Sequence, residues 1–245
     1  EIGVRLVGSE MCIRDSSKVD PINNMRLIFD FYVVFLKEDK NCDLLYGRQR
    51  YDYQKGSIVS LAPGQVIGTE DTGEKFQPKG WALCFHPDLI RGTTLGRNIK
   101  EYTFFSYEVN EALHLSEKER TIIIDCLEKI RYELQQSIDR LSKRLIATNI
   151  ELLLDYCLRF YERQFITRGN VNHDILTRFE RLLDDYFIGP KAAQNGLPSV
   201  KECANKLCLS PNYFGDLIKK ETGKTAQEYI CLLYTSPSPR DGLLS

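Results

Sequence analysis

Residues 199–230 constrain the fold of this chain more than any other segment, and they read SVKECANKLCLSPNYFGDLIKKETGKTAQEYI. Ser199 precedes Glu202 by three residues, a spacing that lets the hydroxyl and the carboxylate cap the first free backbone N–H groups of a helix. Ser210 and Pro211 begin a second helix, because serine is a good cap and proline is tolerated at the first helical position. Only two residues lie between the helices. The pattern therefore predicts two short helices joined by a tight turn.

Each of the two predicted helices has one apolar face. Apolar side chains recur at i, i+3, i+4 and i+7, which lie on one side of a helix. Gly223 can end the second helix in the left-handed conformation. The inward positions are Val200, Cys203, Ala204 and Leu207 in the first helix, and Phe214, Leu217 and Ile218 in the second. The outward positions of the second helix are Asn212, Gly215, Asp216, Lys219 and Lys220.

The run S-P-x-Y-F-x-x-L-I-K-K-x-x-G-K-T-x-x-E-Y-I within this segment resembles the first helix-turn-helix of AraC/XylS-type bacterial transcription regulators. Residues 53–66 (YQKGSIVSLAPGQV) and 80–90 (GWALCFHPDLI) resemble the cupin-like sensor domain that many of these regulators carry. The resemblance covers residues 25–230. The DNA-binding part of that family has two helix-turn-helix units, and we expect this chain to contain only the first.

The resemblance implies a sequence-specific transcription regulator that binds double-stranded promoter DNA through its second helix, placed in the major groove. Asparagine can bridge two atoms of adenine, aspartate can accept from cytosine, and lysines can reach phosphates. Cys208 stands at a turn position where positive φ is usual, which costs on the order of 1 kcal/mol for a residue with a Cβ. The residues to which the family pattern gives DNA-binding roles are Asn212, Tyr213, Gly215, Asp216, Lys219 and Lys220.

The N-terminal half of the chain predicts a small antiparallel β-barrel, so the fold class is α+β. Aromatic and β-branched residues dominate Met25–Lys37, and turn residues flank Ser57–Leu61. Leu44–Tyr53 and Trp81–Phe85 give two further strands. Both faces of Met25–Lys37 are apolar, which is consistent with a barrel wall covered from outside. We assign residues 17–95 to this cupin-like sensor barrel.

Residues 96–190 predict a helical linker. A capping box at Ser116 and Glu119 begins an apolar stripe at spacings of three and four that continues to Phe165, with a break near residues 137–139. The stripe either packs against the chain's own barrel or joins two protomers, as the linking helices of the resembling family often do. A further helix covers residues 174–187. The Gly/Pro-bearing stretch 188–198 marks the boundary with the DNA-binding part, residues 191–231.

The two ends of the chain do not share the character of the rest. The segments EIGVRLVGSEMCIRDS (1–16) and LLYTSPSPRDGLLS (232–245) resemble translated read-through from sequencing adaptors. Natural flexible termini are the alternative, because chain ends are often disordered. In either case we expect no function there and leave both segments out of the fold. Charged residues interrupt the first segment, so it is not a signal peptide, and we expect a cytoplasmic protein without membrane contact.

Composition excludes most other classes of function. The chain has three histidines and no His-x-His pair, so we expect no metal, no cofactor and no enzyme activity. Eight dispersed cysteines without a CxxC pair indicate free thiols. The net charge is −1, and residues 199–230 carry five lysines against four carboxylates, a weakly basic footprint. Alternatives to a regulator with a small-molecule effector are a sensor and dimerisation module without productive DNA binding, and a ligand-binding cupin without regulatory function.

Overall fold

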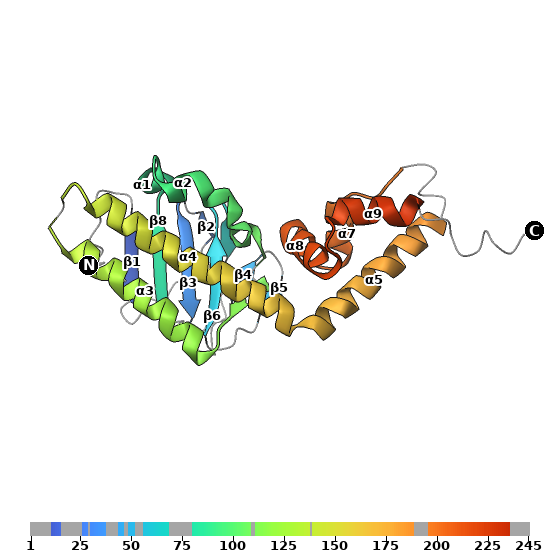
Figure 1. The fold of residues 1–245 in the computed structure, drawn as a ribbon, viewed down its shortest axis with the longest axis horizontal. Coiled ribbons are helices and arrows are strands. Elements are labelled where there is room, and N and C mark those ends of the chain that lie inside the picture. Colours follow the sequence, from blue (N-terminus) through green and yellow to red (C-terminus); the bar gives the residue numbers. More distant parts are fainter. Residues whose placement is uncertain are drawn as a thin grey trace, which may run out of the picture. The chain divides into compact units, whose positions relative to one another are not determined.

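The computed structural model contains two compact units, Glu1–Gln164 (unit 1) and Phe165–Ser245 (unit 2), whose elements are labelled in Figure 1. In the described part of the chain, every strand belongs to unit 1 and unit 2 is helical, so the predicted α+β class is confirmed. None of the described helices has both the length and the apolar composition needed to cross a membrane. The described residues are 11–15, 26–28, 30–37, 44–46, 49–51, 56–68, 80–108, 111–137, 139–188 and 196–235.

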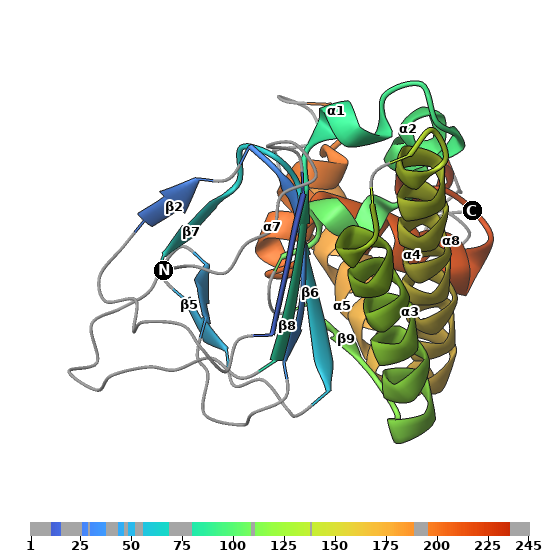
Figure 2. The ribbon, with the colours of Figure 1, turned by 90° about the vertical axis from the view of Figure 1, so that its left-hand side faces the viewer.

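Unit 1 contains two antiparallel sheets. The larger sheet has the order β1-β8-β3-β6-β9, from β1 (Met11–Asp15), β8 (Gly80–Phe85), β3 (Tyr32–Lys37), β6 (Ser57–Leu61) and β9 (Leu113–His114). The smaller sheet has the order β2-β7-β4-β5, from β2 (Arg26–Ile28), β7 (Val66–Gly68), β4 (Leu44–Tyr46) and β5 (Gln49–Tyr51). Figure 2 shows the smaller sheet facing one side of the larger one, while helices α3 (Glu117–Gln135) and α4 (Ser142–Thr167) cover the other side.

The described strands do not close into the barrel that the sequence predicts, because no ladder among them joins the two sheets. Val33 and Val34, adjacent on β3, are 0% and 2% exposed, so both faces of this strand are covered. Helices cover one face and the second sheet lies over the other, as Figure 2 shows. A strand in this position has the same apolar pattern as a barrel wall, and the pattern therefore could not distinguish the two.

The predicted strands lie at the expected positions in the sequence, but two of them are each divided into two shorter strands. β6 and β8 lie where they were predicted. Met25–Lys37 is not one strand, because a bend at Asp30 and Phe31 separates β2 from β3, and these two strands belong to different sheets. Leu44–Tyr53 is likewise divided into β4 and β5, which pair with each other as a hairpin. In both cases the run of apolar residues gave no sign that the chain changes direction within it.

Both terminal segments that were left out of the fold contribute described residues. β1, within residues 1–16, pairs along its length with β8, from Met11 opposite Phe85 to Asp15 opposite Trp81. At the other end, helix α9 (Ala226–Thr235) continues into the segment 232–245. The remaining residues of the two segments lie outside the described part of the chain.

Helices α3 and α4 follow the predicted stripe. The capping box is present, because Ser116 Oγ accepts from the N–H of Glu119 at 3.4 Å and Glu119 Oε2 accepts from the N–H of Ser116 at 2.8 Å. Most apolar side chains of the stripe pack within the chain, whereas Leu141 and Leu145 are exposed, so the structure supports packing within the chain for part of the stripe and leaves the second alternative open for the rest. Fully or nearly fully buried members are Ile123, Leu127 and Ile130 on α3, and Ile146, Ile150 and Leu153 on α4.

Polar contacts hold α4 to the rest of unit 1. Arg163 donates to Glu119 Oε1 at 3.0 Å and to the carbonyl of His114 at 2.7 Å. Near the middle of α4, Asp155 Oδ1 accepts from the hydroxyl of Tyr102 at 2.7 Å. Burial, followed by the hydrogen bond to this carboxylate and its charge, raises the pKa of Tyr102. These bonds fix the position of α4 along the sheet.

Two short helices and two 3-10 turns connect β8 to β9. Helix α1 (Pro87–Ile90) begins at His86, whose Nδ1 accepts from the N–H of Asp88 at 3.2 Å, so this histidine has a structural role as a helix cap. Helix α2 (Thr94–Asn98) begins at Thr93 and is followed by η3 (Ile99–Glu101) and η4 (Thr103–Ser106). Aromatic side chains of η4 pack on β3 and β8. The ring centres of Phe105 in η4 and Tyr32 in β3 are 4.9 Å apart.

Unit 2 is a group of helices around α8. Its elements are the end of α4, α5 (Gly169–Ile188), α7 (Val200–Lys206), α8 (Pro211–Thr222) and α9. α5, α7 and α9 all pack against α8. The predicted helix 174–187 is confirmed as part of α5. Most of the predicted linker 188–198 lies outside the described residues.

Candidate nucleic-acid interface

The turn between α7 and α8 is closed by backbone hydrogen bonds. The N–H of Leu207 donates to the carbonyls of Cys203 and Ala204, and the N–H of Leu209 donates to Ala204 at 3.0 Å. Cys208 has φ 59° and is the one non-glycine residue with positive φ in the described part of the chain. The positive φ expected at this position is therefore confirmed. The strain identifies a turn whose geometry the surrounding helices enforce.

Both ends of α8 are capped as the sequence predicts. Ser210 is buried, and its Oγ accepts from the N–H of Tyr213 at 3.2 Å, while Pro211 occupies the first helical turn. At the other end Gly223 adopts the left-handed conformation with φ 71°, and its N–H donates to the carbonyl of Lys219 at 2.9 Å. α8 therefore begins and ends at positions set by its own sequence.

The inward face of α8 forms the core of unit 2. Phe214, Leu217 and Ile218 are all 0% exposed. The ring of Phe214 meets Phe179 of α5 edge to face, with ring centres 4.8 Å apart, a favoured aromatic geometry. Cys203 and Ala204 of α7 are also completely buried, so α7 packs through the predicted stripe. The apolar contacts fix which side of α8 remains available to a partner.

The outward face carries the predicted polar residues. Asn212, Lys219 and Lys220 are exposed, and Gly215 and Asp216 are partly exposed. Positions 212, 215, 216 and 219 follow the spacing i, i+3, i+4 and i+7, so they share one side of the helix. The structure thus brings together five of the six predicted DNA-binding residues on one face of α8.

Tyr213, the sixth residue predicted to contact DNA, does not lie on this face. The side chain is 5% exposed, and its ring lies 5.1 Å from that of Phe165 at the end of α4. Tyr213 follows the outward residue Asn212 in the sequence, and the family pattern gave it a DNA-binding role as well. In a helix the next residue is turned by about 100°, and here that rotation places the tyrosine in the core.

The charges around the interface are mixed. Asp216 stands among the lysines of the outward face, where a carboxylate repels phosphate. Glu202, which caps α7, accepts from the backbone N–H of Ser199 at 2.9 Å and from its hydroxyl at 2.8 Å. These hydrogen bonds lower the pKa of Glu202 below its ordinary value, so this carboxylate is negatively charged at neutral pH. The weakly basic footprint expected from the sequence therefore applies to the folded helices.

Sequence reasoning missed the polar residues that join α5 to α8 and α9 to α5. Nδ2 of Asn172 donates to the carbonyl of Phe165 at 2.7 Å and to Glu221 Oε1 at 3.1 Å. Tyr229 donates to Glu180 at 2.5 Å, and burial, followed by this bond and the charge of Glu180, raises the pKa of Tyr229 to about 12. These partners stand 49 residues apart in both side-chain pairs, so local spacing carries no signal for them.

The arrangement offers amide, carboxylate and ammonium groups on a helix with a fixed start, which suits recognition of a polar surface. No group of three or more His, Cys, Asp or Glu residues in the described chain is placed to hold a metal ion. Neither a family model nor a curated protein matches this chain. The function proposed below therefore depends on the residues and their geometry.

Gly215 allows a first prediction about α8 itself. A Cβ at this position would meet no atom within 4 Å, and glycine in a helix interior is less favourable than alanine by about 0.5–1 kcal/mol. Gly215→Ala is therefore expected to raise the free energy of unfolding of unit 2 by that amount in urea titrations followed by circular dichroism. A lowered midpoint would mean that the outward face of α8 is more crowded than the structure indicates.

Proposed function

We propose that this chain is part of a sequence-specific DNA-binding transcription regulator, in which α8 enters the major groove. The observation that supports this most is the polar outward face of α8, carried by a helix with both ends capped and a strained turn before it. A helix of 12 residues is about 18 Å long, and the major groove of B-DNA admits an α-helix. In this proposal α7 lies across the DNA backbone and positions α8.

The outward residues have separate roles in this proposal. Asn212 lies in the first turn of α8, where side chains reach base edges, and its amide can bridge N6 and N7 of adenine. Asp216, one turn further on, can accept from cytosine N4. Lys219 and Lys220 are in the last turn and contact phosphates, which fix the register without reading sequence. Gly215 has no side chain to read a base and allows close approach of the helix.

Unit 1 is the signal-sensing part in this proposal, a cupin-like domain with a small-molecule effector, in a cytoplasmic protein. Its support is the resemblance of residues 53–66 and 80–90, together with a structure in which two antiparallel sheets face each other. Within the described residues, α7 and α8 form one helix-turn-helix unit, which corresponds to the first half of such a reader. Its weak positive charge implies modest affinity for DNA on its own.

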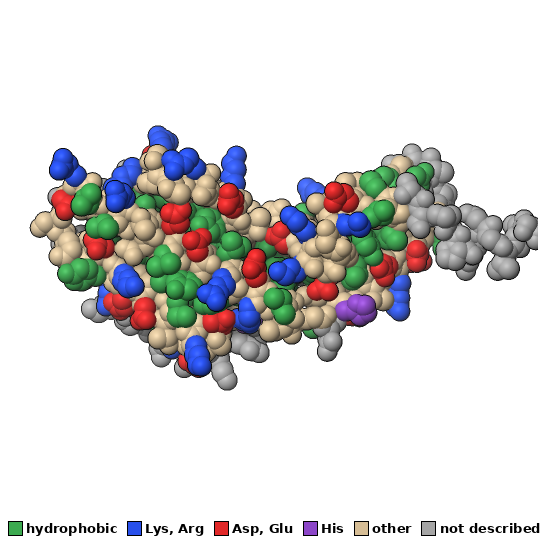
Figure 3. Space-filling view, viewed as in Figure 1, with side chains coloured by type: hydrophobic (Ala, Val, Ile, Leu, Met, Phe, Trp, Pro, Cys, Tyr) green, Lys and Arg blue, Asp and Glu red, His purple; other side chains and the backbone are tan. Residues whose placement is uncertain are grey.

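A second candidate function is a dimerisation and interaction module, and exposed apolar side chains favour it. Leu145 and Leu152 are 42% and 39% exposed on one side of α4, Leu141 just before α4 is 53% exposed, and Tyr132 of α3 is 62% exposed. Figure 3 shows hydrophobic side chains gathering over α3 and α4. A homodimer through the helices of residues 116–165 would cover them. It is compatible with DNA binding and would double the number of DNA contacts.

The role assignment predicts different consequences for two substitutions. Asn212→Ala is expected to reduce discrimination between a selected DNA site and scrambled DNA by about 1–3 kcal/mol, because base contacts specify sequence. Lys219→Ala is expected to weaken binding to both DNAs equally and to reduce the slope of log K against log salt concentration by about 1. Fluorescence anisotropy over a series of salt concentrations measures both quantities, with the site obtained by selection from a random library.

An exposed residue of α7 provides a matched control. Asn205→Ala removes the same type of side chain from a position outside the outward face of α8 and is expected to leave the discrimination unchanged. If selection yields no preferred site while sedimentation shows a dimer, the interaction module is the better description. Equal losses for Asn212→Ala on both DNAs would show that this asparagine does not read bases.

A further inference from the structure

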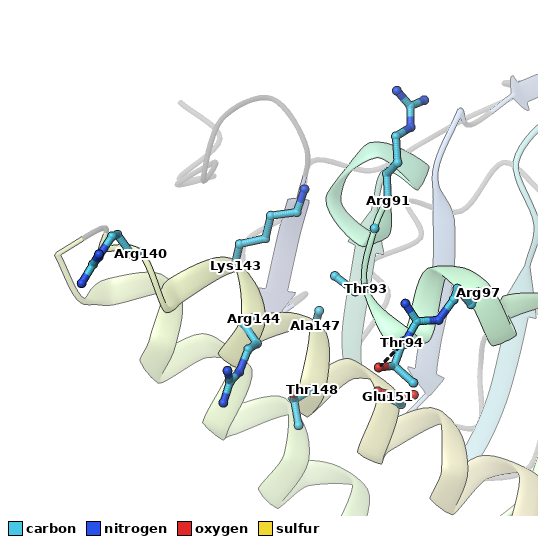
Figure 4. A pocket seen from close by; sticks show the side chains of 11 residues that line it. Arg91, Thr93, Thr94, Arg97, Arg140, Lys143, Arg144, Ala147, Thr148 and Glu151 are labelled. Carbon is cyan, nitrogen blue, oxygen red and sulfur yellow. Dashed lines mark hydrogen bonds between the residues drawn. The ribbon is translucent and has the colours of Figure 1, made fainter.

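A groove of about 470 Å³ lies in unit 1, between the α1–α2 loop and the first turns of α4 (Figure 4). Its position is distinct from the outward face of α8, which belongs to unit 2. The volume falls within the range of about 300–1,000 Å³ that is typical of small-molecule sites. The charged side chains that line the groove are Arg91, Arg97, Arg140, Lys143, Arg144 and Glu151.

The groove concentrates positive charge in a chain whose net charge is −1. Five basic side chains line it against one carboxylate, Glu151. Arg91 pairs with Asp88 at 2.5 Å, whereas the other four basic side chains form no ion pair among the described residues. Figure 3 shows Lys and Arg side chains gathered along the edge of unit 1 that carries α1 and α2. An anion bound between these side chains would neutralise part of this positive charge.

The walls of the groove are held in place by buried contacts. Thr93 Oγ1 donates to the carbonyl of Ile90 at 2.6 Å and accepts from the N–H of Gly96 at 3.2 Å. A Cβ at Gly96 would lie 2.1 Å from the same carbonyl, so only glycine permits this close approach. Leu95 and Ala147 are 0% and 2% exposed and anchor the two sides. These contacts fix the backbone beside the groove, whereas the basic side chains that line the groove are exposed.

Two of the basic side chains come from opposite walls. Lys143 Nζ donates to the carbonyl of Asp88 at 3.2 Å, which uses one of its three N–H groups. The Arg97 guanidinium lies beside Thr94, to whose Oγ1 it donates at 3.4 Å. Figure 4 shows these two side chains on either side of Thr93 and Ala147, while Arg140 points away. Both retain N–H donors for a ligand placed between the walls.

We propose that this groove binds a small anion that carries two or more phosphate groups. The planar guanidinium donates two parallel bonds to phosphate oxygens, and an ammonium group adds a compact positive charge. The hydroxyls of Thr94 and Thr148, at the edges of the groove, can donate to further oxygens. Binding of this anion to the groove is independent of the DNA-binding proposal. A role for the anion as the effector of a regulator rests on the proposed function.

Isothermal titration calorimetry of the full chain with pyrophosphate tests the proposal. The wild-type chain is expected to bind one pyrophosphate, and Arg97→Gln/Lys143→Gln is expected to bind it at least about tenfold more weakly, because two charge-assisted contacts are lost. Arg97→Lys/Lys143→Arg keeps both charges and should recover most of the affinity. Arg159→Gln removes one exposed cation from the same helix α4, outside the groove, and is expected to change the affinity by less than about twofold.

Two results would overturn the proposal. One is the absence of binding heat at constant ionic strength in the wild-type chain, whose fold is verified by circular dichroism. The other is equal affinity of the double glutamine variant and Arg159→Gln. If pyrophosphate does not bind while the double variant loses affinity for duplex DNA, the groove is a DNA contact and not a small-anion site. Because the pyrophosphate titration contains no DNA, its outcome is separate from that of the Asn212 experiment.

Discussion

Phe214→Ala is expected to destabilise unit 2 strongly while the stability of unit 1 is unchanged. Phe214 is fully buried where α8 meets α5, so the substitution removes its contact with Phe179 and leaves a cavity. Such changes cost about 3–5 kcal/mol, a large part of the roughly 5–15 kcal/mol that stabilises an ordinary domain. The helices around α8 depend on this one side chain more than on any residue of the outward face.

Trp81 makes the experiment selective. It is the one tryptophan of the chain and lies on β8 in unit 1, so its fluorescence reports on unit 1, whereas circular dichroism at 222 nm reports on the helices of both units. In urea, Phe214→Ala should lower the dichroism midpoint of unit 2 by more than about 1 M and leave the fluorescence midpoint unchanged. Val171→Ala shortens an exposed apolar side chain of α5 and serves as the control. A single transition that shifts in both signals would mean that the units unfold together.

Gly80→Ala is expected to destabilise unit 1 by about 2–5 kcal/mol. Gly80 has φ +146°, and a Cβ there would lie 2.0 Å from the carbonyl oxygen of Leu36. The clash is with backbone and not with a flexible side chain, so β3 and β8 must separate at the pair Lys37 and Gly80. Trp81 follows Gly80 directly, and the urea midpoint of its fluorescence measures the loss.

Gly64→Ala separates the clash from the cost of positive φ. Gly64 has φ +84° in the turn before β7, and a Cβ there would meet no atom within 4 Å. The alanine is therefore expected to cost about 1 kcal/mol through the backbone alone. If the two substitutions have equal effects, β8 can shift away from Leu36 more easily than the structure indicates.

The helices of unit 2 could be predicted from the sequence because their signals are local. Ser199 with Glu202, Ser210 with Pro211, and Gly223 each determine one helix end through hydrogen bonds to residues within four positions. The apolar spacing then determines which side of each helix is buried. The capping box at Ser116 gave the start of α3 in the same way.

The features of the fold and of the candidate site that were not predicted depend on contacts between segments far apart in the sequence, and residue spacing gives no signal for such contacts. The burial of Tyr213 depends on Phe165, 48 positions earlier, and the two-sheet arrangement depends on where short strands change direction. The groove of unit 1 combines residues 91–97 with residues 140–151, which only the fold brings together. Lysines and arginines in those two stretches are unremarkable when each stretch is read alone.

The division of α8 into an inward and an outward side has a consequence for how such a protein can diversify. The side chains that determine the fold, Ser210, Phe214, Leu217, Ile218 and Gly223, are different from those that a partner would meet. Positions 212, 215, 216 and 219 can therefore change together without disturbing the core. A gene that acquired new residues only at these positions would inherit a folded helix with a new chemical surface and an unchanged core.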